Sequence, residues 1–343
     1  MLCQELRRAV GDGGLLARDR ALLAMISGGR DSTCLLDVAV ALLGPEAVGA
    51  LHVNYGLRQE ADADERHCVA LCRQLAVELE VVHAQGAPRA GDGSSSDRRP
   101  GAAPGRGSAA GSSPAGNLQA WARELRYAHA ERLARGRDAL IATGHTASDQ
   151  VETILYRLAA SPGRRALLGM PASEGRLVRP LLGFTREHTA AYCRERGLSW
   201  REDHSNEDRR YARARVRHEL VPALRAVHPA AEANVLRTAS LLREETELLD
   251  ALVERELDGR REIEIARLRE LPPALARMVV VRLAEDATGA YVPQAGERVH
   301  EILALAGRSS IGRGGRAELH VGGRAGAVID AGRLTMVKLP PRA

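Results

Sequence analysis

The chain has 343 residues, of which 45% are hydrophobic and 27% are charged, so it is long enough and apolar enough to form a core. This composition excludes a wholly disordered or fibrous protein. The net charge of +5 is compatible with a polyanionic partner but does not establish one. No apolar run approaches the roughly 18 residues of a membrane span, and we expect no membrane partner.

The usage of single residue types restricts the chemistry. Lys338 is the one lysine among 49 basic residues and lies outside any Gly-Lys-Ser/Thr sequence, which excludes a Walker A loop and a Schiff-base lysine. Aromatic residues make up 3% of the chain, so any bound RNA must be held by arginine rather than by an aromatic sheet. The five cysteines form no Cys-x-x-Cys pair, which indicates a reducing compartment, and we expect a cytoplasmic protein.

Short apolar runs alternate with segments of helical period over the first half of the chain. This alternation predicts an α/β fold, with a parallel sheet covered by helices on both faces and a ligand at the carboxyl ends of the strands. Strands are predicted at 21–26, 47–53, 79–83 and 139–142, and helices at 31–43, 62–76, 117–135 and 146–158.

The rest of the chain has a different character. Residues 86–116 consist entirely of Gly, Ala, Ser, Pro, Arg and Asp, which predicts a disordered surface insertion. After about Arg217 the sequence predicts helices at 230–257, 264–283 and near 296–305, and then short strands at 317–321, 327–329 and 333–337. We therefore expect a catalytic domain at 1–217, a helical module at 218–290 and a small C-terminal α+β segment at 291–343.

A glycine-rich turn joins the first predicted strand to its helix. Its sequence is Ser27-Gly28-Gly29-Arg30-Asp31-Ser32. Glycines let backbone N–H groups approach a ligand, and a helix N-terminus attracts negative charge, so we predict an anion site here. The Asp31 carboxylate would repel a bare phosphate, and therefore indicates either a bridging Mg²⁺ or a helix N-cap. The hexapeptide resembles the pyrophosphate loop of the PP-loop ATPases, which cleave ATP to AMP and pyrophosphate and adenylate a substrate oxygen.

Further stretches resemble one branch of that superfamily, the tRNA(Ile)-lysidine synthetases. The sequence HVNYGLR at 52–58 is similar to the family's His-Val-Asn-His-Gly-Leu-Arg, with Tyr55 in place of the second histidine. The resemblance places His52 and Asn54 at the nucleotide.

A second stretch, ARELRY at 122–127, is similar to the family's Ala-Arg-x-x-Arg-Tyr. The resemblance assigns an arginine here to the carboxylate of the amino-acid substrate. It leaves open whether Arg123 or Arg126 has this role, and the bare spacing also fits a solvated helix face.

A third stretch, GHTASDQVET at 144–153, is similar to the family's Gly-His-Thr-Ala-Asp-Asp-Gln-x-Glu-Thr, with Ser148 replacing the first Asp. On a helix, His145, Asp149 and Glu152 share one face. The resemblance implies that the two carboxylates contact a lysine substrate and that the histidine lies near the reacting phosphate. The alternative is an N-capped helix with solvated acids.

The remaining motifs lie between residues 179 and 217. RPLL at 179–182 and WREDHSNED at 200–208 are similar to the family's Arg-Pro-Leu-Leu and Trp-x-Glu-Asp-x-Ser-Asn-x-Asp. In the following Arg-Asn-x-x-Arg motif, Ala214 replaces the Asn. We expect an RNA-facing strip of arginines, with a solvated charged helix as the alternative. Its members are Arg209, Arg210, Arg213, Arg215 and Arg217.

The resemblance implies a ligase that uses ATP and Mg²⁺. The C2 oxygen of the wobble cytidine in tRNA(Ile) with a CAU anticodon would attack the α-phosphate, and free L-lysine would then displace AMP to give lysidine. The catalytic residues would be Asp31, His145, Asp149 and Glu152, with Asp31 and Asp149 also holding the metal. Which carboxylate acts as base stays open, as does the oligomeric state, a homodimer included.

Two other functions stay open. A PP-loop tRNA thiolase would need paired cysteines, and the nearest candidates here are Cys68 and Cys72. A catalytically weakened tRNA-binding homologue is suggested by the departures at Tyr55, Ser148 and Ala214. Pyrophosphate release would separate an active enzyme from such a homologue.

Overall fold

The structure is a computed structural model that describes residues 2–17, 19–57, 59–85, 114–160, 163–202, 212–307 and 316–340. These residues form two compact units, which divide after Leu242 within helix α10 (Ala231–Leu257). The predicted insertion lies outside the described residues up to residue 113, and residues 114–116 already belong to helix α4. None of the helices in the described ranges combines the length and apolar character that a membrane crossing needs.

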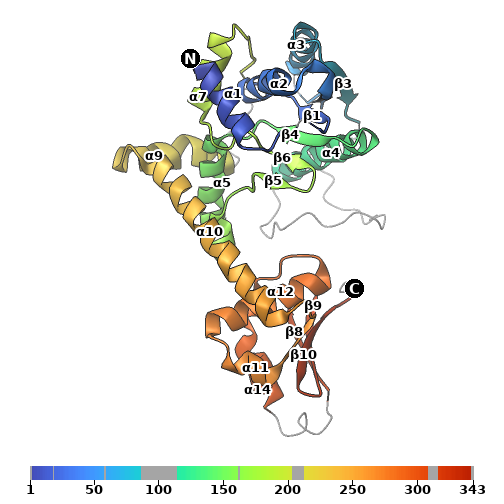
Figure 1. Ribbon diagram of the computed structural model, residues 1–343, viewed down its shortest axis with the longest axis vertical. Coiled ribbons are helices and arrows are strands. Elements are labelled where there is room, and N and C mark those ends of the chain that lie inside the picture. Colours follow the sequence, from blue (N-terminus) through green and yellow to red (C-terminus); the bar gives the residue numbers. More distant parts are fainter. Residues whose placement is uncertain are drawn as a thin grey trace. The chain divides into compact units, whose positions relative to one another are not determined.

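A six-stranded sheet in the order β3-β2-β1-β4-β6-β5 forms the centre of the first unit (Figure 1). β1, β2, β3, β4 and β6 pair in parallel, and β5 pairs antiparallel to β6. The predicted α/β fold with a parallel sheet is therefore confirmed. The strands are β1 (Leu22–Met25), β2 (Val48–Asn54), β3 (Glu78–His83), β4 (Leu140–Thr143), β5 (Ser173–Glu174) and β6 (Leu177–Val178).

Side chains alternate across this sheet and contribute to two cores. Leu22 and Ala24 of β1 pack in one core with residues of α1, α2, α3 and α7. Leu23 and Met25, which alternate with them along the strand, pack in a second core with Ala130 and Ala134 of α4. Because both faces are covered, every residue of β1 and β4 is buried, and only Thr143 at the end of β4 is polar. The helices are α1 (Leu2–Asp12), α2 (Arg30–Leu43), α3 (Ala61–Gln74), α4 (Pro114–Gly136), α5 (Ala147–Ala160), α6 (Arg164–Leu167) and α7 (Arg186–Glu195), with a 3₁₀ turn η1 (Pro45–Ala47) before β2.

A buried carboxylate connects α1, α2 and α7. Asp37 is 2% exposed and accepts hydrogen bonds from Arg7 Nη2 at 2.8 Å and from the Tyr192 hydroxyl at 2.5 Å. Arg196 adds two bonds of 3.1 Å. Burial by itself would raise the pKa of Asp37, but these donors outweigh it and hold the pKa below its usual value. The ionised carboxylate therefore stabilises the contact of three helices.

The first unit ends later than the sequence predicts. After α7 it contains α8 (Ala212–Arg215), the π-helical turn η3 (Val216–Leu220), α9 (Val221–Val227) and the start of α10. Val216, Val221 and Leu236 pack with Val151 and Leu155 of α5, so this apolar contact makes the segment after 217 part of the first unit.

The second unit is one body rather than the helical module and separate C-terminal segment that we expected. Residues from Val253 to Met336 contribute to a single core. The predicted helix at 264–283 is broken at Pro272, whose ring nitrogen has no N–H to donate. The predicted C-terminal strands form an antiparallel sheet, and β7 joins it as a further strand in the order β7-β10-β9-β8. The elements are β7 (Glu262–Glu264), α11 (Ile265–Glu270), α12 (Pro273–Thr288), α13 (Gln294–Glu297), α14 (Val299–Ala306), β8 (Ala317–Gly322), β9 (Ala325–Asp330) and β10 (Arg333–Lys338).

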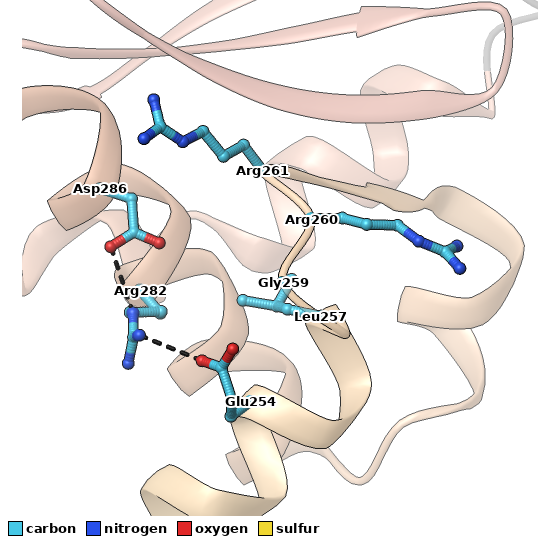
Figure 2. Close-up of a pocket in the computed structure, with 7 residues that line it drawn as sticks. All are labelled: Glu254, Leu257, Gly259, Arg260, Arg261, Arg282 and Asp286. Carbon is cyan, nitrogen blue, oxygen red and sulfur yellow. Dashed lines mark hydrogen bonds and ion pairs between the residues drawn. The ribbon is translucent and has the colours of Figure 1, made fainter.

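A small cavity of about 240 Å³ lies within this second unit. Figure 2 shows Arg282 between Glu254 and Asp286, with which it forms ion pairs of 3.1 and 3.2 Å. Arg260 and Arg261 extend from the loop that follows α10 (Figure 2). Because the Arg282 guanidinium is already paired with two carboxylates, we do not regard this cavity as a ligand site.

Replacing Asp37 by Asn should lower the free energy of unfolding at pH 7 by about 2–4 kcal/mol, because two guanidinium groups lose their buried counter-charge. The folded pKa lies below the unfolded pKa of about 3.9, so this stabilisation is complete above that value and disappears as the pH falls through the folded pKa. The stability gap between wild type and Asp37→Asn, measured by urea denaturation, should therefore shrink below about pH 4.

The exposed Asp12 provides the matched control. Its pair with Arg8 lies on the surface, and Asp12→Asn should change stability by less than about 0.5 kcal/mol. A gap for Asp37→Asn that is the same at pH 3 and pH 7 would contradict the role assigned to its charge.

Candidate active site at the carboxyl ends of the strands

The glycine-rich turn between β1 and α2 is closed by its own hydroxyl groups. Ser32 Oγ donates to the Gly29 carbonyl at 2.8 Å and accepts from the Ser27 backbone N–H at 3.2 Å. Gly28 adopts φ +78°, a left-handed conformation that favours glycine. Gly29 is the N-cap of α2, and no side chain caps the helix. The first N–H groups of α2 thus have no side-chain acceptor, as an anion site requires.

The turn after β4 lies directly against this loop. A Cβ atom on Gly144 would lie 2.9 Å from the carbonyl carbon and oxygen of Asp31 and 3.0 Å from the Ser32 nitrogen. Only glycine permits so close an approach of two backbones. β1 and β4 are neighbours where the strand order reverses, which is the position at which open α/β sheets bind ligands.

Arg186, the first residue of α7, contacts three carboxylates. Its Nη1 donates to Glu152 Oε1 at 2.6 Å, and its Nη2 donates to Asp149 Oδ1. Its Nε lies 4.0 Å from Asp31 Oδ2. The phosphate loop and the acidic residues of α5 therefore form one charged cluster, although they are more than a hundred residues apart in the sequence.

A second guanidinium reaches the same acidic pair from η3. Arg217 Nε donates to Glu152 Oε1 at 2.8 Å and Nη2 donates to Oε2 at 3.3 Å, in a bidentate arrangement. The same Nη2 lies 3.7 Å from Asp149 Oδ1. Arg217 was predicted in an RNA-facing strip, and here it lies on the carboxylates instead of extending into solvent.

The two aspartates of the cluster differ in pKa. Burial raises the pKa of Asp31, the nearby charge of Asp149 raises it further, and the bonds from Thr189 and Arg30 oppose this only in part. Burial would also raise the pKa of Asp149, but Arg186 and two bonds from Thr146 hold it below its usual value. Asp149 is thus firmly ionised, and Asp31 is the carboxylate that would gain most from an added cation.

His145 is a neutral imidazole at pH 7. Burial lowers its pKa to about 4, and the positive charges of Arg179, Arg123 and Arg126 contribute to this although Asp149 opposes it. Its Nδ1 lies 2.8 Å from the Thr143 hydroxyl oxygen. An uncharged ring can exchange hydrogen bonds with a phosphate or a base without adding charge.

The two candidate arginines of α4 face the ring of Tyr127. The guanidinium carbons of Arg123 and Arg126 lie 4.7 and 5.8 Å from the ring centroid. Among the described residues, Arg126 Nε, the Tyr127 hydroxyl and Arg179 Nε are buried without a hydrogen-bond partner. These polar atoms have unused capacity to bind a ligand, as a carboxylate subsite requires.

The predicted nucleotide residues on β2 are engaged in local bonds. Asn54 Nδ2 donates to Asp62 at 3.1 Å and Glu65 at 2.8 Å, and its Oδ1 accepts from the Gly56 N–H. His52 Nδ1 lies 3.1 Å from the Ile26 carbonyl, just before the phosphate loop. In this structure Asn54 shapes the β2–α3 turn, and His52 adjoins the loop.

Three residues that the sequence analysis did not single out position the loop. Thr189 donates to Asp31 Oδ1 at 2.5 Å, and the Arg201 N–H donates to the Gly28 carbonyl at 2.9 Å. Arg186 lies beside Asp31, with 4.0 Å between its Nε and Asp31 Oδ2. Arg201 lies inside the resembling stretch 200–208 and Arg186 lies between that stretch and RPLL, but a motif does not show which side chain faces the site. Of the remaining arginine strip, Arg213 and Arg215 lie on α8 and are exposed, and residues 209 and 210 lie outside the described residues.

Comparisons with known proteins agree with this geometry. Residues 3–224 match the PP-loop domain family. The tRNA(Ile)-lysidine synthase of Pseudomonas fluorescens is 39% identical over 238 residues, which are 67% of this chain and 48% of that protein. The tRNA(Ile)-lysidine synthase of Mycolicibacterium paratuberculosis is 37% identical over 270 residues, which are 77% of this chain and 75% of that protein.

The chain belongs to the tRNA(Ile)-lysidine synthase family of PP-loop proteins. It spans about half the length of the Pseudomonas relatives that it matches. Among solved structures, the U34-tRNA thiolase NcsA from Methanococcus maripaludis with its 4Fe-4S cluster has a TM-score of 0.53 at 16% identity, over 71% of this chain and 79% of that chain. At this identity the likeness shows a shared fold and nothing about the reaction.

Gly144→Ala tests the contact between the two loops. The added methyl group must displace the Asp31 backbone, so we expect a loss of about 1–3 kcal/mol in the free energy of unfolding and weaker ATP binding. Urea denaturation and calorimetric ATP titration would measure the two effects. Gly183→Ala is the control, because its Cβ would meet no atom within 4 Å, and equal behaviour of the two variants would argue against a tight contact.

Proposed function

We propose that this protein is an ATP-dependent ligase that joins L-lysine to C2 of the wobble cytidine of tRNA(Ile) with a CAU anticodon, forming lysidine. The proposal rests on the backbone contact between Gly144 and Asp31. This contact brings the phosphate loop and the uncapped N-terminus of α2 next to the turn that leads into α5 and its acidic pair, Asp149 and Glu152. A site for an anion and a site for a cation thereby adjoin at one sheet edge. Adenylation by ATP followed by attack of an amine needs both.

The donor set fits Mg²⁺ that arrives with ATP. The described residues contain no group of three His, Cys, Asp or Glu side chains placed to hold a metal ion by themselves. Mg²⁺ on a nucleotide needs one or two carboxylates besides the phosphates, and Asp31 and Asp149 would provide them. Bound there, the metal would neutralise charge on the phosphates of the departing pyrophosphate.

The reaction divides into two displacements. The C2 oxygen of the cytidine attacks the α-phosphorus of ATP, the bond to the bridging oxygen breaks, and pyrophosphate leaves. The ε-amine of lysine then forms a bond to C2, AMP leaves with the former C2 oxygen, and the amine loses a proton. The N–H groups at the start of α2 are oriented in advance toward the phosphate charge.

The acidic pair would bind and activate the amine. Asp149 and Glu152 would hold the ε-ammonium, and one of them would take its proton. Arg123 or Arg126 would bind the lysine carboxylate, for which the unpartnered atoms beside Tyr127 provide donors. Neutral His145 would contact the reacting phosphate.

The tRNA would bind along the arginine segment. Arg213 and Arg215 are exposed on α8, and we propose that they contact phosphates. Arg209 and Arg210 belong to the same proposal from the sequence alone. Contacts of this kind position the backbone of the RNA and carry no base preference themselves.

The state of the cysteines argues against the thiolase alternative. Cys68 and Cys72 are buried, and burial raises the pKa of each thiol to about 12. A sulfur relay requires an accessible thiolate at neutral pH, which such thiols do not supply.

The deciding measurement is pyrophosphate release from Mg²⁺–ATP with lysine and tRNA(Ile) bearing a CAU anticodon. We expect release to depend on this tRNA, to fall at least about 100-fold in Asp31→Ala, and to accompany incorporation of labelled lysine into cytidine. Asp12→Ala, on the exposed side of α1, should leave it unchanged. Absence of release with every tRNA offered would instead favour a tRNA-binding homologue.

A further inference from the structure

The acidic pair that would bind the lysine ammonium is already occupied by cations of the chain itself. Arg186 and Arg217 both bind Glu152, and both lie within 4 Å of Asp149. Glu152 is only 7% exposed, so water cannot substitute freely for its partners. Both oxygens of Glu152 already accept hydrogen bonds from guanidinium groups, two from Arg217 and one from Arg186, so an ammonium could bind this carboxylate only at a position that a guanidinium now holds. One guanidinium must therefore leave.

The two arginines differ in how firmly they are held. Arg186 begins a ten-residue helix whose N-terminus is fixed by a capping box between Thr185 and His188. Its side chain is 18% exposed and also lies beside Asp31. Arg217 is 30% exposed, and the partners that the structure gives it are Asp149 and Glu152. Arg217 is the group that can leave with fewer lost contacts.

The backbone at Arg217 has a geometry that can change register. Val216–Leu220 is a π-helical turn, in which the Val221 N–H bonds to the Val216 carbonyl. The next residue, Pro222, has no N–H and cannot donate the α-helical bond to residue 218. π-Helical turns carry one extra residue, and moving that residue along the helix rotates a side chain by about 100°.

We propose that Arg217 is a displaceable occupant of the ammonium position, and that lysine binds Asp149 and Glu152 only as Arg217 moves away. This inference rests on the proposed function. Arg186 stays in place as a positioning residue for the carboxylates. The released guanidinium rejoins the neighbouring arginines of α8, so lysine binding adds a cation to the surface that would contact tRNA phosphates. Such coupling must be reciprocal, and the bound tRNA would then favour lysine.

The test is calorimetric titration of L-lysine into the full chain without tRNA. Removing the occupant in Arg217→Met should tighten lysine binding by about tenfold, because the wild type binds lysine only in the fraction of molecules whose site is open. Arg225→Met is the matched control, since it removes an arginine–glutamate pair with Glu232 in the next helix and should leave the affinity unchanged.

A second measurement uses the wild type and does not depend on how the variants fold. Lysine should speed hydrogen exchange of backbone amides at 212–221 as Arg217 releases its carboxylates. Equal or weaker lysine affinity in Arg217→Met, or slower exchange at 212–221 in the wild type, would overturn the inference and leave the proposed ligase intact. No lysine binding by the wild type or by either variant would remove the lysine substrate itself, and the inference with it.

Discussion

The backbone contact between Gly144 and the first residues of α2 is the constraint on which the rest of the site depends. It joins two turns that follow neighbouring strands, and no side chain intervenes between them. The N-terminus of α2 and that of α5 are thereby brought together, one ready for a phosphate and the other carrying acids. A bulkier residue at this point would separate the two halves of the chemistry.

This proximity brings three carboxylates together, and arginine side chains compensate their negative charge. Asp31, Asp149 and Glu152 are three carboxylates in a partly buried site. Burial is the main cause that raises the pKa of Asp31, and the nearby charge of Asp149 adds to it. Arg186 and Arg217 supply compensating charge from elements later in the chain. The cluster is therefore assembled from distant segments, and its net charge is set by how many cations occupy it at once.

The departures from the family motifs can now be assigned physical roles. Ser148 Oγ accepts from the Arg186 N–H at 3.3 Å, so the hydroxyl helps to seat α7 beside the acidic pair. The Tyr55 hydroxyl donates to the Ala122 carbonyl at 2.9 Å and its ring meets Trp121 edge-on, which fixes the end of β2 to α4. Ala214 is buried at 6% exposure, where a polar Asn would need a partner. All three substitutions are accommodated by local packing, and Ser148 is the one that stands where the family motif has a charged residue.

The sequence by itself determined the α/β fold, the phosphate loop and the membership of the family. Apolar runs of strand length and segments of helical period are local signals, and the glycine-rich loop is contiguous, so each can be recognised without knowledge of the fold. The features that the sequence did not predict are very short elements and contacts between distant segments. β5 and β6 are too short to show a period, and the division after Leu242 depends on which apolar surfaces meet.

Only the tertiary structure decided how the charged residues pair. The motifs named Asp149 and Glu152, but nothing local connects them with Arg186 or Arg217, which lie more than thirty and sixty residues away in the sequence. Motifs likewise placed Arg217 with its arginine neighbours, whereas the π-helical turn directs it toward the carboxylates. Ion pairing depends on distances of a few ångströms between segments, and such distances are set by packing rather than by the order of residues.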